Sequence, residues 1–103
     1  MNASPLTELK SNAGAMAARL RLMSHPERLL MICRMDEGEV AVSELVDMTG
    51  LSQSSVSQHL AVLREEGAVN VRGEAQTRFY SLSDPLLRGM IHALCTLCDN
   101  RKQ

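Results

Sequence analysis

Aromatic residues and long apolar runs are almost absent from this sequence. It contains no tryptophan, one tyrosine and one phenylalanine. No stretch approaches the roughly 20 apolar residues that a helix needs to cross a membrane, and the first residues lack the charged and apolar regions of an export signal. We therefore expect a cytoplasmic protein that is not attached to a membrane.

Net charge is also small, because 11 lysine and arginine residues are balanced by 12 aspartate and glutamate residues. This balance excludes a polybasic protein that binds nucleic acid through bulk charge, although it allows a local basic surface. The sequence has no glycine-rich phosphate loop, nucleophile elbow or paired carboxylates, so we do not expect an enzyme. Without a linker or an internal repeat, residues 1–103 are expected to form one small domain, for which a dimer would enlarge the core.

Cysteine is scarce, with three residues in 103. An odd number in a chain without an export signal argues against a disulfide scaffold. Buried thiols, a metal site and redox chemistry are the interpretations that remain.

Apolar spacing predicts a helix at each end of the chain. From Leu6 to Met23 apolar residues recur every three or four positions, which is the narrow stripe of a helix that packs against another helix.

Residues 24–27 have capping-box spacing and predict a second helix that runs to about Met35, apolar on most sides. Asp84 and the proline after it predict the start of the last helix.

The middle of the chain predicts a helix-turn-helix. Residues 43–49 form a short helix that Gly50 ends, and Ser52 caps a second helix from Gln53 to about Glu66. After Gly67 the apolar period changes to two, which predicts a β-hairpin over residues 68–82 with its turn at Gly73. The fold class is therefore mainly α with a small β-hairpin: four helices, the hairpin and a last helix, as in a winged helix-turn-helix.

The second helix of this motif begins with residues that suit DNA. Between Ser52 and Leu63 there is no acidic side chain that phosphate would repel. Glutamine can bond adenine in a bidentate manner, and serine hydroxyls and helix N-terminal N–H groups suit phosphate oxygens. A solvated helix face could have the same composition, and a protein-interaction module could use the same fold. The preceding helix, the glycine turn and the hairpin favour DNA.

Residues 16–98 resemble the ArsR/SmtB transcriptional repressors. The resemblance is carried by residues 23–30, 42–45, 51–64 and 74–82, with Ser57-Gln58-His59-Leu60 as its most specific part. It implies a homodimer, held by the first and last helices, that sets two recognition helices in successive major grooves of a near-palindromic double-stranded operator. The DNA-reading residues that it implies are Gln53, Ser54, Ser55, Ser57, Gln58 and His59. The hairpin residues that it implies as DNA contacts are Arg72, Gln76 and Arg78.

Within this family, the sequence is most similar to the sulfide- and redox-responsive branch of BigR, SqrR and HlyU. Cys33 lies where that branch has its first cysteine. The second cysteine of the branch aligns with about Asp99, so that Cys98 falls one residue early and Cys95 four residues early. The two metal sites common in the family are absent or incomplete here, because residues 43–49 hold no cysteine and the last helix offers only His92.

Three interpretations of the thiols remain open. In the first, Cys33 links to Cys98, or less readily to Cys95, after reaction with a persulfide or an oxidant, and the regulator releases DNA. In the second, Cys33, Cys95 and Cys98 bind As(III) or another soft metal ion through three thiolates. In the third, all three are small buried side chains, no cofactor is bound and no thiol-based inducer exists.

Overall fold

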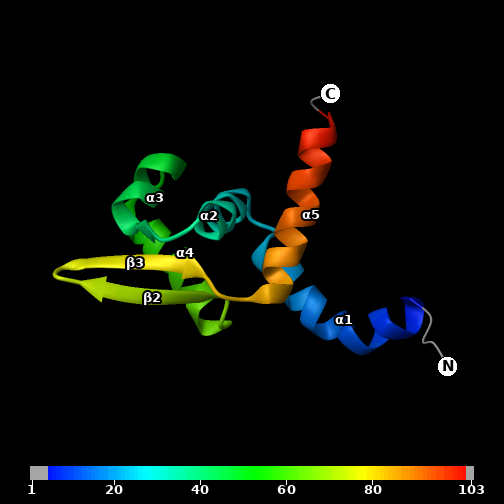
Figure 1. Cartoon of the computed structure of the whole chain (residues 1–103). Coiled ribbons are helices and arrows are strands. Elements are labelled where there is room, and N and C mark those ends of the chain that lie inside the picture. Colours follow the sequence, from blue (N-terminus) through cyan, green and yellow to red (C-terminus); the bar gives the residue numbers. More distant parts are fainter. Residues whose placement is uncertain (1–4, 102–103) are drawn as a thin grey trace.

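The computed structural model of the chain describes residues 5–101, which form five α-helices and a three-stranded sheet (Figure 1). The elements follow one another as α1 (Pro5–Leu22), α2 (Pro26–Asp36), β1 (Val40–Ala41), α3 (Val42–Thr49), α4 (Gln53–Glu65), β2 (Val69–Glu74), β3 (Thr77–Leu82) and α5 (Pro85–Arg101). This order is the predicted helix-turn-helix followed by a hairpin and a last helix. None of the helices in the described range is long and apolar enough to span a bilayer.

The core is built from one face of each helix in the body of the molecule. Helix α4 buries Val56, Leu60 and Leu63, whose spacing of four and three places them on one side. Burial of each such side chain contributes roughly 1.5–3 kcal/mol. The opposite side of α4 therefore faces solvent in a fixed orientation. The largest fully buried side chains from the other elements are Met31, Ile32, Met35, Val40, Leu45, Leu87 and Ile91.

The sheet has β3 in its centre, antiparallel to β1 on one side and to β2 on the other. The β2–β3 ladder runs from Val69 opposite Leu82 to Glu74 opposite Thr77, so the turn consists of Ala75 and the next residue. The predicted turn at Gly73 is wrong, because Gly73 pairs within the ladder. Ala75 adopts the positive φ of 56° that the turn requires, at a cost of roughly 1–2 kcal/mol.

The start of α2 differs from the predicted capping box. His25 is the N-cap residue with an extended backbone, and its side chain makes no cap hydrogen bond. The Ser24 hydroxyl instead donates to the Arg21 carbonyl at 2.7 Å. Ser24 is thus used by the end of α1, where carbonyl groups lack helical partners.

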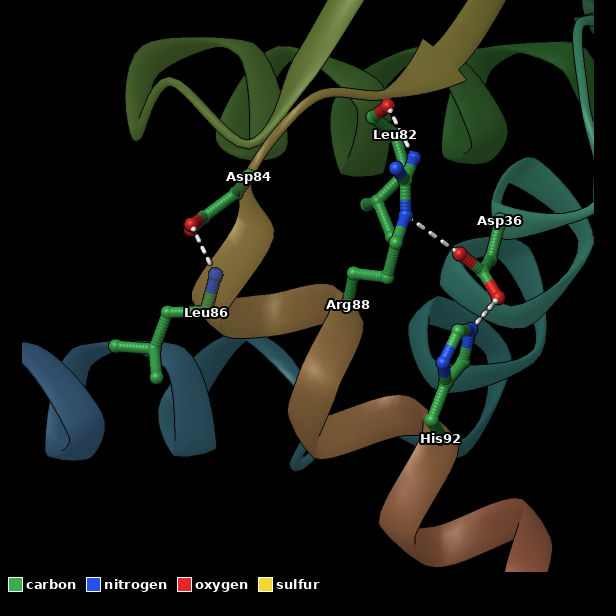
Figure 2. A network of polar contacts seen from close by, with 6 residues as sticks. All are labelled: Asp36, Leu82, Asp84, Leu86, Arg88 and His92. Carbon is green, nitrogen blue, oxygen red and sulfur yellow. Dashed lines mark hydrogen bonds and ion pairs between the residues drawn. The ribbon is translucent and has the colours of Figure 1, made fainter.

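The end of α1 is tied to the body by two arginines. The buried Arg28 of α2 donates to the Leu22 and Arg21 carbonyls at 2.7 and 3.1 Å, and burial lowers the pKa of its guanidinium. Arg19 donates from Nε to Asp84 at 2.8 Å, just before α5. The same Asp84 carboxylate accepts from the Leu86 N–H at 3.1 Å, which confirms it as the cap of the last helix (Figure 2).

Large apolar side chains on α1 and α5 remain exposed. Figure 1 shows both helices at the end of the molecule opposite the hairpin turn. The radius of gyration of 15.3 Å exceeds the value of about 13 Å that is typical of a compact domain of this length. Leu30 of α2 is also exposed, at 54%. The exposed leucines of α1 and α5 are Leu6, Leu9, Leu20, Leu86, Leu94 and Leu97.

Candidate functional site

Helix α4 begins with the predicted serine cap. The Ser52 hydroxyl oxygen accepts from the Ser55 N–H at 3.1 Å, and the first turn contains no acidic residue. The partial positive charge of a helix N-terminus is therefore not neutralised by a carboxylate within this turn. An anionic group such as a phosphate would be stabilised at this end of the helix.

The residues of α4 that are predicted to read DNA face solvent, except Ser55 and His59, which are half-buried. Gln53, Ser54, Ser57 and Gln58 are exposed, on the side opposite the buried stripe. Ser55 is half-buried, and its hydroxyl oxygen accepts from the Ser52 hydroxyl at 3.1 Å. Short polar side chains on one exposed face can reach base edges in a major groove.

His59 lies at the junction between α4 and α2. Its ring centroid is 5.8 Å from that of His25, and the two rings are tilted by 56°. Burial lowers the pKa of His59, and the positive charges of Arg28 and His25 lower it further. The structure thus directs His59 toward α2 and favours its neutral form.

A groove of about 530 Å³ separates the start of α4 from the hairpin. Gln53 and Ser57 lie on one wall, and Gln76, Thr77 and Arg78 lie on the other. Hydroxyl, amide and guanidinium groups are the donors that contact phosphate and sugar oxygens. The groove therefore suits one strand of a nucleic-acid backbone. The residues that complete its lining are Ala41, Val42, Ser43 and Tyr80.

The two hairpin arginines have different surroundings. Arg78 is exposed and lines the groove. Arg72 donates to both carboxylate oxygens of Glu39, at 2.9 and 3.0 Å, and to Glu74 at 3.2 Å. Its guanidinium carbon lies 4.8 Å from the centroid of the Phe79 ring. These hydrogen bonds raise the pKa of Arg72 and lower the pKa of Glu39. Through them, Arg72 joins β2 to the segment before β1.

Two of the three thiols lie close together between α2 and α5. Cys33 is half-buried, whereas Cys95 and Cys98 are exposed, and all three are free. Burial raises the pKa of Cys33, and the neighbouring Cys95 thiol raises it further, with smaller effects from Asp36 and Cys98. Cys95 is therefore the α5 thiol that influences Cys33 most strongly. In the described part of the chain, no group of three or more His, Cys, Asp or Glu side chains is arranged to hold a metal ion.

Comparisons with known proteins decide the family. A family profile described as "Bacterial regulatory protein, arsR family" matches residues 25–71. The transcriptional activator HlyU of Vibrio cholerae is 43% identical over 89 residues, which cover 86% of this chain and 82% of that protein. The chain belongs to the ArsR family. It is therefore a DNA-binding transcription regulator and not an enzyme, as the sequence predicted.

Solved ArsR-family structures confirm the winged helix-turn-helix fold. The transcriptional repressor BigR from Xylella fastidiosa superposes with a TM-score of 0.85 at 35% identity, covering 91% of this chain and 96% of that one. Reduced HlyU from Vibrio cholerae gives a TM-score of 0.81 at 42% identity, covering 87% of this chain and 95% of that one. The similarity thus includes one relative described as a repressor and another described as an activator.

Sequence analysis of this ArsR-family chain did not identify Asp36 as a residue of the thiol site. Asp36, at the end of α2, accepts from Arg88 at 2.8 Å and lies 2.7 Å from His92 Nε2 (Figure 2). Its partners are 52 and 56 positions away, so no local spacing could indicate the contact. In the groove, Thr77 was likewise missed, because strand alternation places it on the face opposite Arg78 and so gave no local signal.

Proposed function

We propose that this ArsR-family regulator binds a near-palindromic duplex operator as a homodimer, and that thiol chemistry at Cys33 controls its release of DNA. Cys95 is the partner of Cys33 in this proposal, with Cys98 as the alternative. The observation that carries the thiol part is the proximity of Cys95 on α5 to Cys33 on α2, close enough for Cys95 to raise the pKa of Cys33. As a DNA-binding regulator, the protein is proposed to act in the cytoplasm.

The DNA part is supported by the exposed face of α4 and the groove beside it. In this proposal Gln53, Ser54, Ser57 and Gln58 read base edges, which their exposure supports, and the capped N-terminus of the helix meets phosphate. Gln76 and Arg78 contact the backbone from the opposite wall of the groove. Ser55, His59 and Arg72 complete the proposed DNA-binding set. His59 and Arg72 act in it mainly through the structure, His59 by supporting α4 and Arg72 by supporting the hairpin.

The second copy of the chain is proposed to cover the exposed leucines of α1 and α5. These leucines lie on the two helices that extend from the body, and exposed apolar surface of this kind is characteristic of an interface. A two-fold symmetric dimer presents two copies of α4 in opposite orientations. A near-palindromic operator follows from that symmetry, because each half-site meets the same residues.

The thiol step is written here for an organic persulfide, RSSH. One cysteine attacks the outer sulfur of the reagent, so that RSH leaves and the protein carries a persulfide. The second cysteine attacks the protein-bound sulfur of that persulfide, and hydrogen sulfide leaves. Two protein thiols are oxidised to a disulfide, while the reagent is reduced to a thiol and hydrogen sulfide. A new covalent bond between α2 and α5 changes how α5 packs, and therefore the spacing of the two α4 helices in the dimer.

Intact-mass analysis of the reduced protein after separate treatment with sulfide, organic persulfide, peroxide and arsenite tests the thiol part. We expect the persulfide to remove two hydrogens by linking Cys33 to Cys95 or Cys98, or to insert additional sulfur between them. An arsenic adduct that bridges all three cysteines would instead favour a metalloid sensor. Unreacted thiols under every treatment would contradict thiol control.

The Cys33→Ser variant is the control for this experiment. It retains Cys95 and Cys98, so any product that it forms comes from those two residues alone. We expect it to lose the cross-helix product. Retention of that product would show that Cys33 is not a partner in the link.

A further inference from the structure

We propose that Asp36 is a positioning residue of the thiol site: it holds α5 on α2 and assigns Cys95 as the attacking thiol and Cys33 as the resolving thiol. This inference rests on the proposed thiol control and adds to it the roles of the individual groups.

Asp36 joins the two helices with both of its carboxylate oxygens. Oδ1 accepts from Arg88 Nε at 2.8 Å, and Oδ2 lies 2.7 Å from His92 Nε2 (Figure 2). The Asp36 side chain is 15% exposed, whereas the two α5 side chains that reach it come from the solvent side. Arg88 also donates to the Leu82 carbonyl at 2.9 Å. The contact therefore joins the end of α2, the end of β3 and the first turns of α5.

Cys33 and Cys95 lie about one helical turn from the contact between Asp36 and His92. Cys33 precedes Asp36 by three residues on α2, and Cys95 follows His92 by three residues on α5. Residues three apart lie on the same face of a helix, so the two pairs are successive contacts along one helix interface. The Asp36 contact thus fixes the relative position of α2 and α5 where the two sulfur atoms must meet.

The surroundings of the two thiols give them different roles. Cys95 is exposed, so a reagent in solution reaches it directly. Cys33 is half-buried, and the groups that face it are Cys95 and Cys98 from α5 and Asp36 from its own helix. Burial raises the pKa of Cys33, the neighbouring Cys95 thiol adds to this effect, and the carboxylate of Asp36 adds less. Because Cys95 is exposed while Cys33 is half-buried and its pKa is raised, Cys95 attacks the reagent first, and Cys33 attacks the persulfide that forms beside it.

The first test measures the order of labelling. The reduced protein is treated briefly with iodoacetamide over a range of pH and digested with trypsin, which separates Cys33 in residues 29–34 from Cys95 and Cys98 in residues 89–101. We expect Cys95 to be labelled before Cys33. Labelling of Cys33 ahead of Cys95 would overturn the assignment of roles.

The effect of the Asp36 charge is tested with the isosteric variant Asp36→Asn. We expect the pH profile of Cys33 labelling to shift to lower pH, with faster labelling at neutral pH, because a negative charge near the thiol is removed. Glu37→Gln removes the charge of the adjacent exposed residue and should leave the profile unchanged. A profile that is the same in Asp36→Asn and the wild type would contradict the role of the carboxylate.

The positioning effect is tested with His92→Ala, a change at an exposed side chain that leaves the Asp36 charge in place. After treatment with a limiting amount of persulfide, we expect less of the tryptic product that links residues 29–34 to residues 89–101, and more of the internal link between Cys95 and Cys98. Thr96→Ala is the control, because the Thr96 hydroxyl donates to the His92 carbonyl of its own helix. Circular dichroism of each variant checks the fold.

The outcomes separate the two proposals. If the wild type forms no cross-helix link, thiol control itself fails, and with it the role of Asp36. If the wild type and His92→Ala form the link to the same extent, thiol control stands and the positioning role of Asp36 is contradicted.

Discussion

The two arginines of the hairpin differ in the partners that surround them. Arg72 is held by Glu39 and Glu74, so its guanidinium already has anionic partners. Arg78 is exposed and lines the groove beside α4. The same residue type thus supports the hairpin in one position and is proposed to contact DNA in the other.

Gln58 and Arg78 are expected to make different contributions to DNA binding. Gln58→Ala should reduce the preference for the operator over random duplex DNA by about 1–3 kcal/mol, because a base contact is lost. Arg78→Ala should weaken binding to both DNAs alike and reduce the salt slope by about 1, because a phosphate contact is lost. Fluorescence-anisotropy titrations at several salt concentrations measure both. Equal changes in preference in the two variants would contradict this division.

His59 is expected to make stability depend on pH. Its pKa is lowered in the folded protein, so the unfolded chain binds the proton more readily. The free energy of unfolding should therefore decrease as the pH falls below about 6.5, the ordinary value for histidine. Urea denaturation at fixed protein concentration should show a smaller decrease for His59→Gln between pH 7 and pH 5. An unchanged pH dependence in this variant would contradict the assignment.

At the scale of the elements, the sequence predicted what local chemistry determines. Ser52 and the absence of acids after it were enough to place the start of α4. The hairpin was predicted but its turn was not, because pairing along the strands moved the turn to Ala75 although glycine favours positive φ. The contact of Asp36 with α5 could not be predicted, since it depends on how two helices far apart in the sequence pack.

The cap of α4 is expected to be important for stability. Ser52→Ala removes the acceptor for the Ser55 N–H, so the free energy of unfolding should decrease by about 1 kcal/mol. Ser54→Ala, on the exposed face of the same helix, should change it by less than about 0.5 kcal/mol. Urea denaturation at matched protein concentration measures both variants. A decrease of equal size in the two would indicate that the cap hydrogen bond is not the cause.

At the scale of the molecule, the two end helices determine its shape. They extend from the body with leucines exposed, and the chain is less compact than a domain of its length that buries its own apolar faces. A second copy that covers these faces accounts for both observations. Helix α5 links the proposed dimer to the thiol site, because it carries Cys95 as well as exposed leucines.

Leu20→Glu should dissociate the proposed dimer. Leu20 is 56% exposed in the single chain, so a charge there is tolerated by the fold but opposes burial against a second copy. Met48→Glu is the control, because Met48 is 42% exposed on α3, outside the two end helices. Sedimentation equilibrium should show a monomer for Leu20→Glu and a dimer for the control and the wild type. A dimer in all three would contradict the proposed interface.

The central claim is that thiol chemistry controls DNA release, and one titration tests it most directly. An operator duplex, selected from a random-sequence library with the reduced protein, is titrated with wild type and Cys33→Ser before and after treatment with an organic persulfide. We predict equal affinities before treatment and a loss of about tenfold or more for the wild type afterwards, an effect of about 1.4 kcal/mol or more. Cys33→Ser should retain its affinity. Equal release by Cys33→Ser, or no release by the wild type, would contradict the account.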